Sequence, residues 1–249
     1  MDEAGTLVAM ASHDRARWRR SIIVAGVASM VAALLLAACT PVAGPEGSSS
    51  TTAPAATATS STVTPGGSNA GTAEIRGQLA ALTIVDGPKP GQPYRRTDWP
   101  TWLDPDGDGC DARQQALIAQ STSPAQVGTN CKVMSGHWVS PYDGVETTAP
   151  GDLDADHLVP LENVHESGGW QWDAAMRRAY ANDPEVLIMV TKHANRSKGA
   201  KSPADYRPPL ESYWCTYASR WVGLKTTWRL SATTRERDTL GQMLDTCAA

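Results

Sequence analysis

The chain has 249 residues, 41% of them hydrophobic, and a formal net charge of −4 at neutral pH. This slightly acidic balance excludes a protein that binds nucleic acid through a basic surface over its whole length, so any such contact needs a local cationic groove. Nine tryptophans, six tyrosines and no phenylalanine supply large aromatic residues that more often pack in a core than bind a ligand.

The N-terminus has the features of an export signal. Several arginines between residues 15 and 20 precede an uncharged run over 21–38, which ends in Leu36-Ala37-Ala38-Cys39. A positive segment, an apolar segment and small residues before a cleavage site are typical of a signal peptide. The ending resembles a bacterial lipobox, so residues 1–39 are predicted to be a lipoprotein signal with Cys39 as the lipidated residue. An uncleaved membrane anchor is the alternative, and both place the remaining chain outside the cytoplasm.

A low-complexity segment follows. Residues 40–73 consist mainly of Ser, Thr, Ala, Gly and Pro, with Glu46 as the only charge. Such a composition buries too little apolar surface to fold, which predicts a disordered linker between membrane and domain. Residues 74–249 then fit one domain of ordinary size with a hydrophobic core.

Four cysteines lie within this domain, at Cys110, Cys131, Cys215 and Cys247. In an oxidising compartment they suggest two disulfides, with three possible connectivities. Proximity in sequence favours Cys110–Cys131 and Cys215–Cys247. A zinc site is the weaker alternative because the sequence has no Cys-x-x-Cys pair.

The pattern of apolar residues predicts an α+β domain. We expect a strand over 153–161, an amphipathic helix over 171–182, a buried strand over 186–190 and a short helix that begins near His193. Pro160 limits the extension of the first strand. His165 is expected in a polar loop or as a minor contributor behind a functional site.

Two helices are predicted near the C-terminus. Residues 210–224 carry an aromatic stripe that we interpret as core packing rather than a stacking surface. Residues 231–247 form the last helix, in which Thr233 and Glu236 have the spacing of a capping box. Its role is structural support.

One motif contains the candidate catalytic and metal-binding residues. Asp156 directly precedes His157 in the first predicted strand, and Asn195 lies far along the chain. Hydrolysis of a phosphodiester needs a base for water and a divalent cation. His157 is the candidate base because its pKa lies near neutrality. Asp156 and Asn195 offer oxygen ligands for one divalent metal, Mg²⁺ in the first place, with Mn²⁺ or Ca²⁺ as alternatives.

Cations surround the proposed asparagine ligand. Arg196, Lys198 and Lys201 are candidates for binding phosphate, because arginine forms paired hydrogen bonds and lysine acts as a point charge. Such contacts bind a nucleic acid backbone without reading its sequence.

These motifs resemble the HNH, or ββα-metal, nucleases, and within them the GmrSD-type C-terminal-domain family of secreted actinobacterial proteins. The resemblance extends from about Tyr94 to the C-terminus. It implies a ββα-metal core with additional helices, in which Asp156 and Asn195 bind the metal and His157 is the base. It also suggests Arg113 as a phosphate ligand, with a surface salt bridge as the alternative.

The resemblance has one departure. HNH domains have a middle asparagine that ties the active-site loop to the histidine backbone. Here Asn182 lies slightly upstream of that position, and it either has this role or simply ends a helix.

The sequence therefore predicts an endonuclease with little sequence specificity for DNA, RNA or both, tethered by lipid and with no protein partner. A non-catalytic surface lipoprotein that binds calcium or the cell wall is the alternative, because Asp104, Asp106 and Asp108 imitate the start of a calcium loop. A turn rich in Asp and Gly is the competing interpretation of that loop. A zinc hydrolase is a third possibility.

Overall fold

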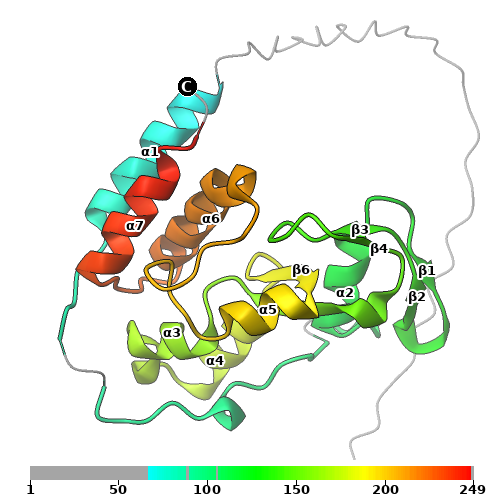
Figure 1. Cartoon of the computed structure of the whole chain (residues 1–249). Coiled ribbons are helices and arrows are strands. Elements are labelled where there is room, and N and C mark those ends of the chain that lie inside the picture. The colour runs from blue at the N-terminus through cyan, green and yellow to red at the C-terminus, as the bar shows by residue number, and fades with distance from the viewer. Residues whose placement is uncertain (1–66, 88–89, 105, 248–249) are drawn as a thin grey trace, which may run out of the picture. The chain divides into compact units, whose positions relative to one another are not determined.

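The computed structural model describes residues 67–87, 90–104 and 106–247 (Figure 1). The predicted signal peptide with Cys39 and most of the predicted linker lie outside these residues. Helix α1 (Gly67–Ala81) begins within the last part of the segment predicted as linker. The predicted boundaries between signal peptide, linker and domain, at residues 39 and 73, otherwise stay predictions.

The described part contains helices and small antiparallel sheets, so the predicted α+β class is confirmed. The strands are β1 (Gln126–Val127), β2 (Val133–Ser135), β3 (Trp138–Val139), β4 (Glu146–Thr147), β5 (Leu153–His157) and β6 (Leu187–Thr191). The α-helices after α1 are α2 (Ala112–Ala119), α3 (Leu161–Glu166), α4 (Ala174–Ala181), α5 (Lys192–Lys198), α6 (Trp214–Thr227) and α7 (Thr234–Leu244). Short 3-10 turns occur at Arg96–Asp98, Thr129–Cys131, Pro150–Asp152, Gly169–Gln171 and Glu211–Tyr213.

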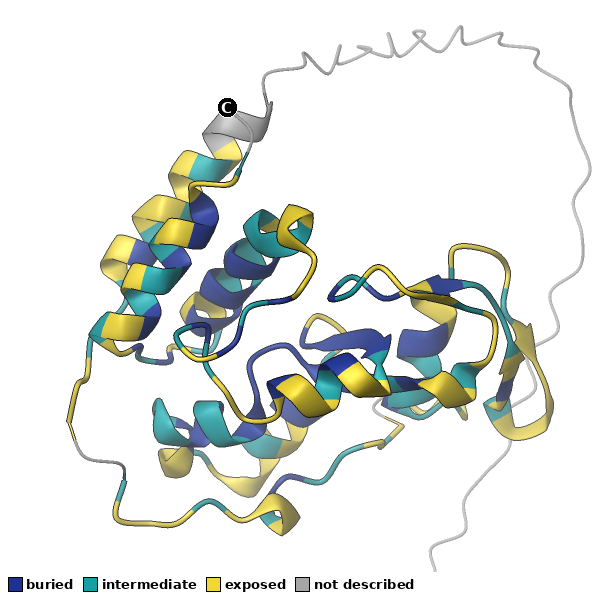
Figure 2. Cartoon of the chain, in the orientation of Figure 1, coloured by how far each residue is buried: buried dark blue, intermediate teal, exposed yellow. Residues whose placement is uncertain are grey.

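Strands β5 and β6 form the antiparallel pair that carries the sequence motif. Their register joins Leu153 to Thr191 at one end and His157 to Leu187 at the other. Successive side chains of a strand point to opposite faces. Leu187 and Met189 accordingly contribute to one buried cluster, while Ile188 contributes to another. The pair therefore lies between two cores, which explains why β6 is an apolar run that is buried from Leu187 to Val190, as its dark blue colour in Figure 2 shows.

Helix α5 follows β6 directly and packs against both strands of this pair. The Thr191 side chain caps the helix by accepting a hydrogen bond from Ala194 N at 3.1 Å. Gly199 ends it with φ of 52°, a left-handed conformation that glycine adopts without steric cost. The predicted order of strand, strand and helix is therefore present.

The first strand is shorter than expected. It ends at His157, and Pro160, which has no backbone N–H, leads into helix α3. The prediction that His165 lies in a polar loop was wrong, because His165 is buried on α3 and its Nε2 lies 2.8 Å from Gln92 O. A six-residue helix is too short to produce a clear apolar period in the sequence.

The C-terminal helices form the larger core. Helices α6 and α7 pack against each other and against α1, as Figure 1 shows. Tyr217 and Trp221 of the predicted stripe are fully buried, which confirms their packing role. The predicted capping box is also present, since Thr233 caps α7 and Glu236 binds back to the Thr233 backbone.

Both predicted disulfides are confirmed. Cys110 pairs with Cys131 and Cys215 with Cys247, with Cα atoms 5.1 Å and 4.9 Å apart respectively. The first joins the Asp-rich loop to the segment before β2, and the second joins α6 to the residues after α7. In the part of the chain that the structure describes, no helix is long and apolar enough to cross a membrane.

Candidate active site

A cavity of about 420 Å³ lies along strand β5. It brings together Asp156 and His157 of β5, Asn195 of α5 and Arg113 of α2, as the sequence motifs required. Its other lining residues with polar or aromatic side chains are Tyr94, Arg96, Trp102, Asp154 and Glu162.

His157 is held in one tautomer. Its Nε2 lies 3.0 Å from the carbonyl oxygen of Ala181, at the end of α4. A carbonyl oxygen only accepts hydrogen bonds, so Nε2 carries the proton and Nδ1 carries the lone pair. Among the described residues, Nδ1 has no hydrogen-bond partner. This nitrogen is therefore able to accept a proton.

The surroundings of His157 keep it neutral. Burial lowers its pKa to about 4, because a charged ring loses its hydration. The Ala181 carbonyl opposes this shift, whereas the nearby cations Arg96 and Lys198 reinforce it. The imidazole is consequently unprotonated at neutral pH, but its pKa is well below the near-neutral value expected from the sequence, so the ring is a weaker base than an exposed histidine.

Asp156 is a buried carboxylate with protein donors on both oxygens. Lys198 Nζ donates to Oδ1 at 2.8 Å and the Tyr142 hydroxyl donates to Oδ2 at 2.7 Å. Burial raises the pKa of Asp156, and the Lys198 ammonium and the two hydrogen bonds oppose that rise. Burial and Asp156 also raise the pKa of Tyr142 well above its usual value, so its hydroxyl remains a donor.

The expectation that Lys198 binds phosphate was wrong. Its side chain is fully buried, and Nζ donates to Asp156 and, at 3.0 Å, to the carbonyl oxygen of His157. A lysine in this position ties helix α5 to strand β5. It presents no charge to a substrate.

Asn195 faces strand β5 and is oriented by a residue that the sequence reasoning missed. Its Nδ2 donates to Asp154 Oδ2 at 2.9 Å. The Asn195 side-chain oxygen Oδ1 has no donor among the residues that the structure describes. Asp154 could have been found from the sequence, because it lies two residues before Asp156 and therefore on the same face of the strand.

The donor set fits a divalent cation. Among the described residues, the amide oxygen of Asn195 has no donor, and each carboxylate oxygen of Asp156 accepts one hydrogen bond. Carboxylate and amide oxygens are the ligands that Mg²⁺ prefers, and this ion keeps several waters. Two protein ligands at an open cavity leave room for the waters that such an ion keeps.

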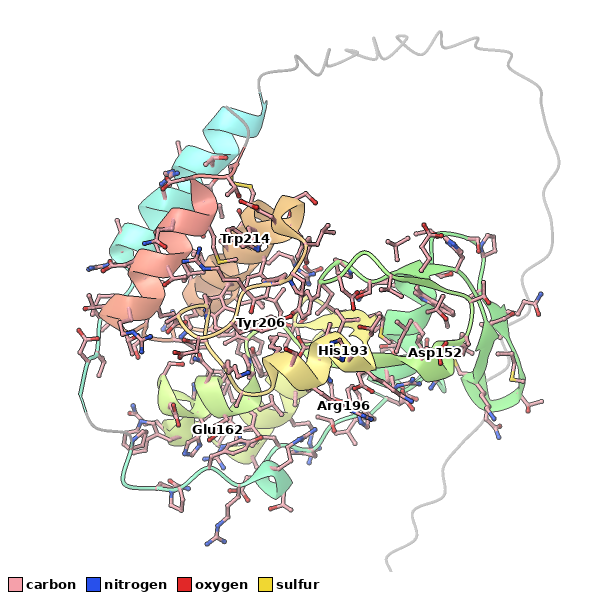
Figure 3. All side chains as sticks on the ribbon, in the orientation of Figure 1. Asp152, Glu162, His193, Arg196, Tyr206 and Trp214 are labelled. Carbon is pink, nitrogen blue, oxygen red and sulfur yellow. A yellow bond between two sulfur atoms is a disulfide. The ribbon has the colours of Figure 1, made fainter. Side chains whose placement is uncertain are left out.

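The other side chains that were predicted to bind phosphate differ in their position relative to the cavity. Arg113 lines the cavity and donates through Nη2 to the carbonyl oxygens of Pro150 and Leu153 at 3.0 and 3.3 Å. Arg196 and Lys201 are exposed and do not line it. Figure 3 shows Arg196 extending from α5, near the exposed His193. Arg96, which was not singled out in the sequence, lines the cavity instead.

Asn182 is buried at the C-terminal end of α4. Its Oδ1 accepts a hydrogen bond from Leu103 N at 2.8 Å, and its Nδ2 donates to Pro100 O at 2.9 Å. It therefore both ends a helix and fastens a loop, although the loop is the one at 100–103 rather than the histidine backbone. Its neighbour Ala181 supplies the carbonyl that holds His157.

Asp104, Asp106 and Asp108 gather at a separate place. Their carboxylates lie within 4.8 Å of one another, all exposed. Asp104 accepts hydrogen bonds from the backbone of Gly107 and Gly109 at 2.7 and 2.9 Å, as in a turn rich in Asp and Gly. Within the described residues this is the only group of three or more acidic, His or Cys ligands close enough to hold an ion.

Comparison with known proteins identifies the family. The family model described as "GmrSD restriction endonucleases, C-terminal domain" matches residues 113–243. The chain belongs to this family. An "Uncharacterized secreted protein" of Arthroderma benhamiae is 42% identical over 173 residues, which cover 68% of this chain and 82% of the relative. No solved structure matches the chain.

Membership of the GmrSD C-terminal-domain family makes this a nuclease-type domain. The match includes Arg113, Asp156, His157 and Asn195, whereas Arg96 and Trp102 precede it. The disulfides fit an extracytoplasmic location, and the Arthroderma relative is named as secreted. The actinobacterial lipoprotein form stays a prediction.

Proposed function

We propose that this GmrSD-family domain is a metal-dependent endonuclease of the HNH, ββα-metal type that hydrolyses phosphodiester bonds with little sequence specificity. The observation that carries the proposal is the fixed tautomer of His157. Its protonated Nε2 binds Ala181 O, its Nδ1 has no hydrogen-bond partner in the described part of the chain, and the residue lines one cavity with Asp156 and Asn195. The family match supports a nuclease but leaves substrate and mechanism to experiment.

In this proposal His157 Nδ1 takes a proton from the attacking water. Asp156 and Asn195 would hold one divalent cation, most simply Mg²⁺, which when bound stabilises negative charge on the phosphate and the leaving oxygen. Asp154 orients the Asn195 amide. Ala181 keeps the histidine ring in place while it gains and loses the proton.

Phosphate binding is assigned to arginines around the cavity. Within the described residues, Arg113 uses only Nη2 in hydrogen bonds, to the carbonyl oxygens of Pro150 and Leu153, which leaves Nε and Nη1 for a phosphate. Arg96 lies near enough to lower the pKa of His157 and can contact the same phosphate. Arg196 and Lys201, on the outside of α5, would bind the nucleic acid backbone farther from the cleaved bond.

The decisive experiment is nicking of supercoiled plasmid by the purified protein. We expect cleavage with Mg²⁺, none with excess chelator, and a loss of at least a hundredfold in His157→Ala. His193→Ala, which changes an exposed histidine on α5, is the matched control and should cleave like the wild type. Equal cleavage by His157→Ala would remove the proposed base.

The cluster of Asp104, Asp106 and Asp108 favours a second candidate, a calcium-binding surface protein. Calorimetry with Ca²⁺ separates the two functions. Binding that is lost in Asp106→Ala, together with an absence of nicking under every metal, would support the binder. Binding without effect on nicking would leave the nuclease in place.

The proposed location is the outer side of a membrane, with a lipid anchor at Cys39. The support comes from the lipobox-like sequence before Cys39. Metabolic labelling with a radioactive fatty acid tests it, with Cys39→Ala as the variant that should lose the label. Retained label would contradict lipidation at this residue.

A further inference from the structure

Trp102 occupies the cavity wall next to the proposed base. Its ring centroid lies 6.0 Å from that of His157 with an interplanar angle of 30°, so the two rings are neighbours in a tilted arrangement. The tryptophan nevertheless remains 37% exposed. No other ring contact of Trp102 occurs among the described residues. An indole ring is thus presented to the cavity with part of its surface open.

The backbone at Trp102 is unusual. Its φ is 59°, in the left-handed region that a bulky residue rarely adopts because of steric strain. Hydrogen bonds on both sides of the residue maintain it, because Asn182 accepts from Leu103 N and donates to Pro100 O. A constrained loop therefore sets the direction of the ring.

The same asparagine couples this loop to the base. Asn182 directly follows Ala181, whose carbonyl oxygen orients His157. Arg96, on the same segment as Trp102, donates to Trp99 O and Thr101 Oγ1 at 2.7 and 3.1 Å and lines the cavity. The segment thus places a cation and an aromatic face beside one proton acceptor.

We infer that Trp102 is a stacking platform for the nucleobase adjacent to the cleaved phosphate, and that the preferred substrate is single-stranded or locally unpaired nucleic acid. This inference rests on the proposed nuclease function. With the phosphate at His157 and Arg96, the base attached to the neighbouring sugar lies within reach of the indole. Stacking on an aromatic side chain is available to every base, so it agrees with low sequence specificity.

The preference for an unpaired base follows from geometry. In a duplex both faces of each base are covered by neighbouring base pairs, and insertion of a side chain requires unfavourable unstacking of a base step. A single strand offers its bases without that cost. Trp102 should consequently contribute to binding of single strands and hardly to binding of duplex.

The test compares binding of two probes to the full-length protein in the presence of chelator, which prevents the proposed cleavage. The probes are a short labelled oligodeoxythymidine and a labelled, fully paired linear DNA duplex without a loop, and binding of each is followed by fluorescence anisotropy. Trp102→Asn removes the ring and suits the left-handed backbone. Trp102→Tyr keeps an aromatic face. Trp170→Ala removes an equally exposed tryptophan, 39% exposed, that does not line the cavity.

We expect Trp102→Asn to weaken binding of the single strand about five- to a hundredfold and to change binding of the duplex less than about twofold. Trp102→Tyr should stay within about threefold of the wild type on both probes, and Trp170→Ala should not differ from it. Thermal melting of each variant verifies the fold.

Equal weakening on both probes would show that Trp102 only shapes the cavity, and unchanged binding of the single strand would also overturn the inference. Failure of the proposed nuclease function would give a different set of results. If His157→Ala cleaves like the wild type, the assigned base is wrong while the binding comparison still reports stacking. If the wild type neither binds nor cleaves either probe, both proposals are wrong.

Discussion

Lys198 and Asp156 form an ion pair in which Nζ lies 2.8 Å from Oδ1, with the lysine side chain fully buried and the aspartate side chain 6% exposed. Removal of one member of such a pair leaves a buried charge without its partner. We expect Lys198→Met to reduce the free energy of unfolding by about 3–5 kcal/mol, measured by urea denaturation.

Two variants test this explanation. Lys201→Met removes an exposed lysine close in sequence and should change stability by less than about 0.5 kcal/mol. The double variant Lys198→Met with Asp156→Asn removes both charges and should recover part of the loss. If the double variant is no more stable than Lys198→Met alone, the buried charge is not the cause.

Asp154 is predicted to act on the metal through Asn195. Because it orients the Asn195 amide at 2.9 Å, Asp154→Ala should raise the Mg²⁺ concentration needed for half-maximal cleavage about ten- to a hundredfold. Asp152→Ala changes an exposed aspartate outside the cavity and is the control. An unchanged Mg²⁺ dependence in Asp154→Ala would remove this positioning role.

Stability should fall in acid because of His157. Its pKa is 6.5 in the unfolded chain and about 4 in the fold. Between these values the unfolded chain binds a proton that the folded chain excludes, so lowering the pH favours unfolding. The contribution is fully present above pH 6.5 and lost by pH 4, and at roughly 1.4 kcal/mol per pKa unit it amounts to about 3 kcal/mol.

Denaturation of His157→Gln across this pH range measures that contribution. The raised pKa of Asp156 acts in the opposite direction in acid, so the informative quantity is the difference between the wild type and the variant. This difference should shrink as the pH falls from 6.5 to 4. His193→Gln, on an exposed part of α5, should follow the wild type, and a constant difference for His157→Gln would contradict the prediction.

The two residues of the α7 capping box should differ in their importance. Thr233 contributes a cap alone, so Thr233→Ala should cost about 1 kcal/mol. Glu236 also accepts a hydrogen bond from Trp221 Nε1 at 2.6 Å and pairs with the buried Lys225 at 2.8 Å. Glu236→Leu should therefore cost about 3 kcal/mol or more. Similar losses in thermal unfolding of the two variants would indicate that Lys225 tolerates the loss of its partner.

Much of the central motif could be predicted from the sequence. The apolar run of β6, the acid beside His157 and the asparagine after β6 are local patterns, and together they indicated two strands, a helix and a cavity between them. The capping box and both disulfides could also be predicted. The capping box depends on spacing within a short segment, and the disulfide pairing was inferred from the even number of cysteines in the domain and their proximity in sequence.

The role of Lys198 was missed although a signal existed. Residues three apart share a face of a helix, so if Asn195 faces β5, Lys198 faces it too. Trp102 and Arg96 carried no such signal. Their loop has no repeating pattern, and it reaches the cavity only because Asn182, distant in sequence, binds its backbone at Pro100 and Leu103.

Two parts of the cavity wall depend on Asn182. One amide anchors the Trp102 turn, and the preceding peptide group restrains the histidine. A substitution of Asn182 would therefore alter both the position of Trp102 and the orientation of His157. Natural variation in substrate choice should accordingly be found in the side chains of the 94–102 segment rather than in the asparagine that anchors it.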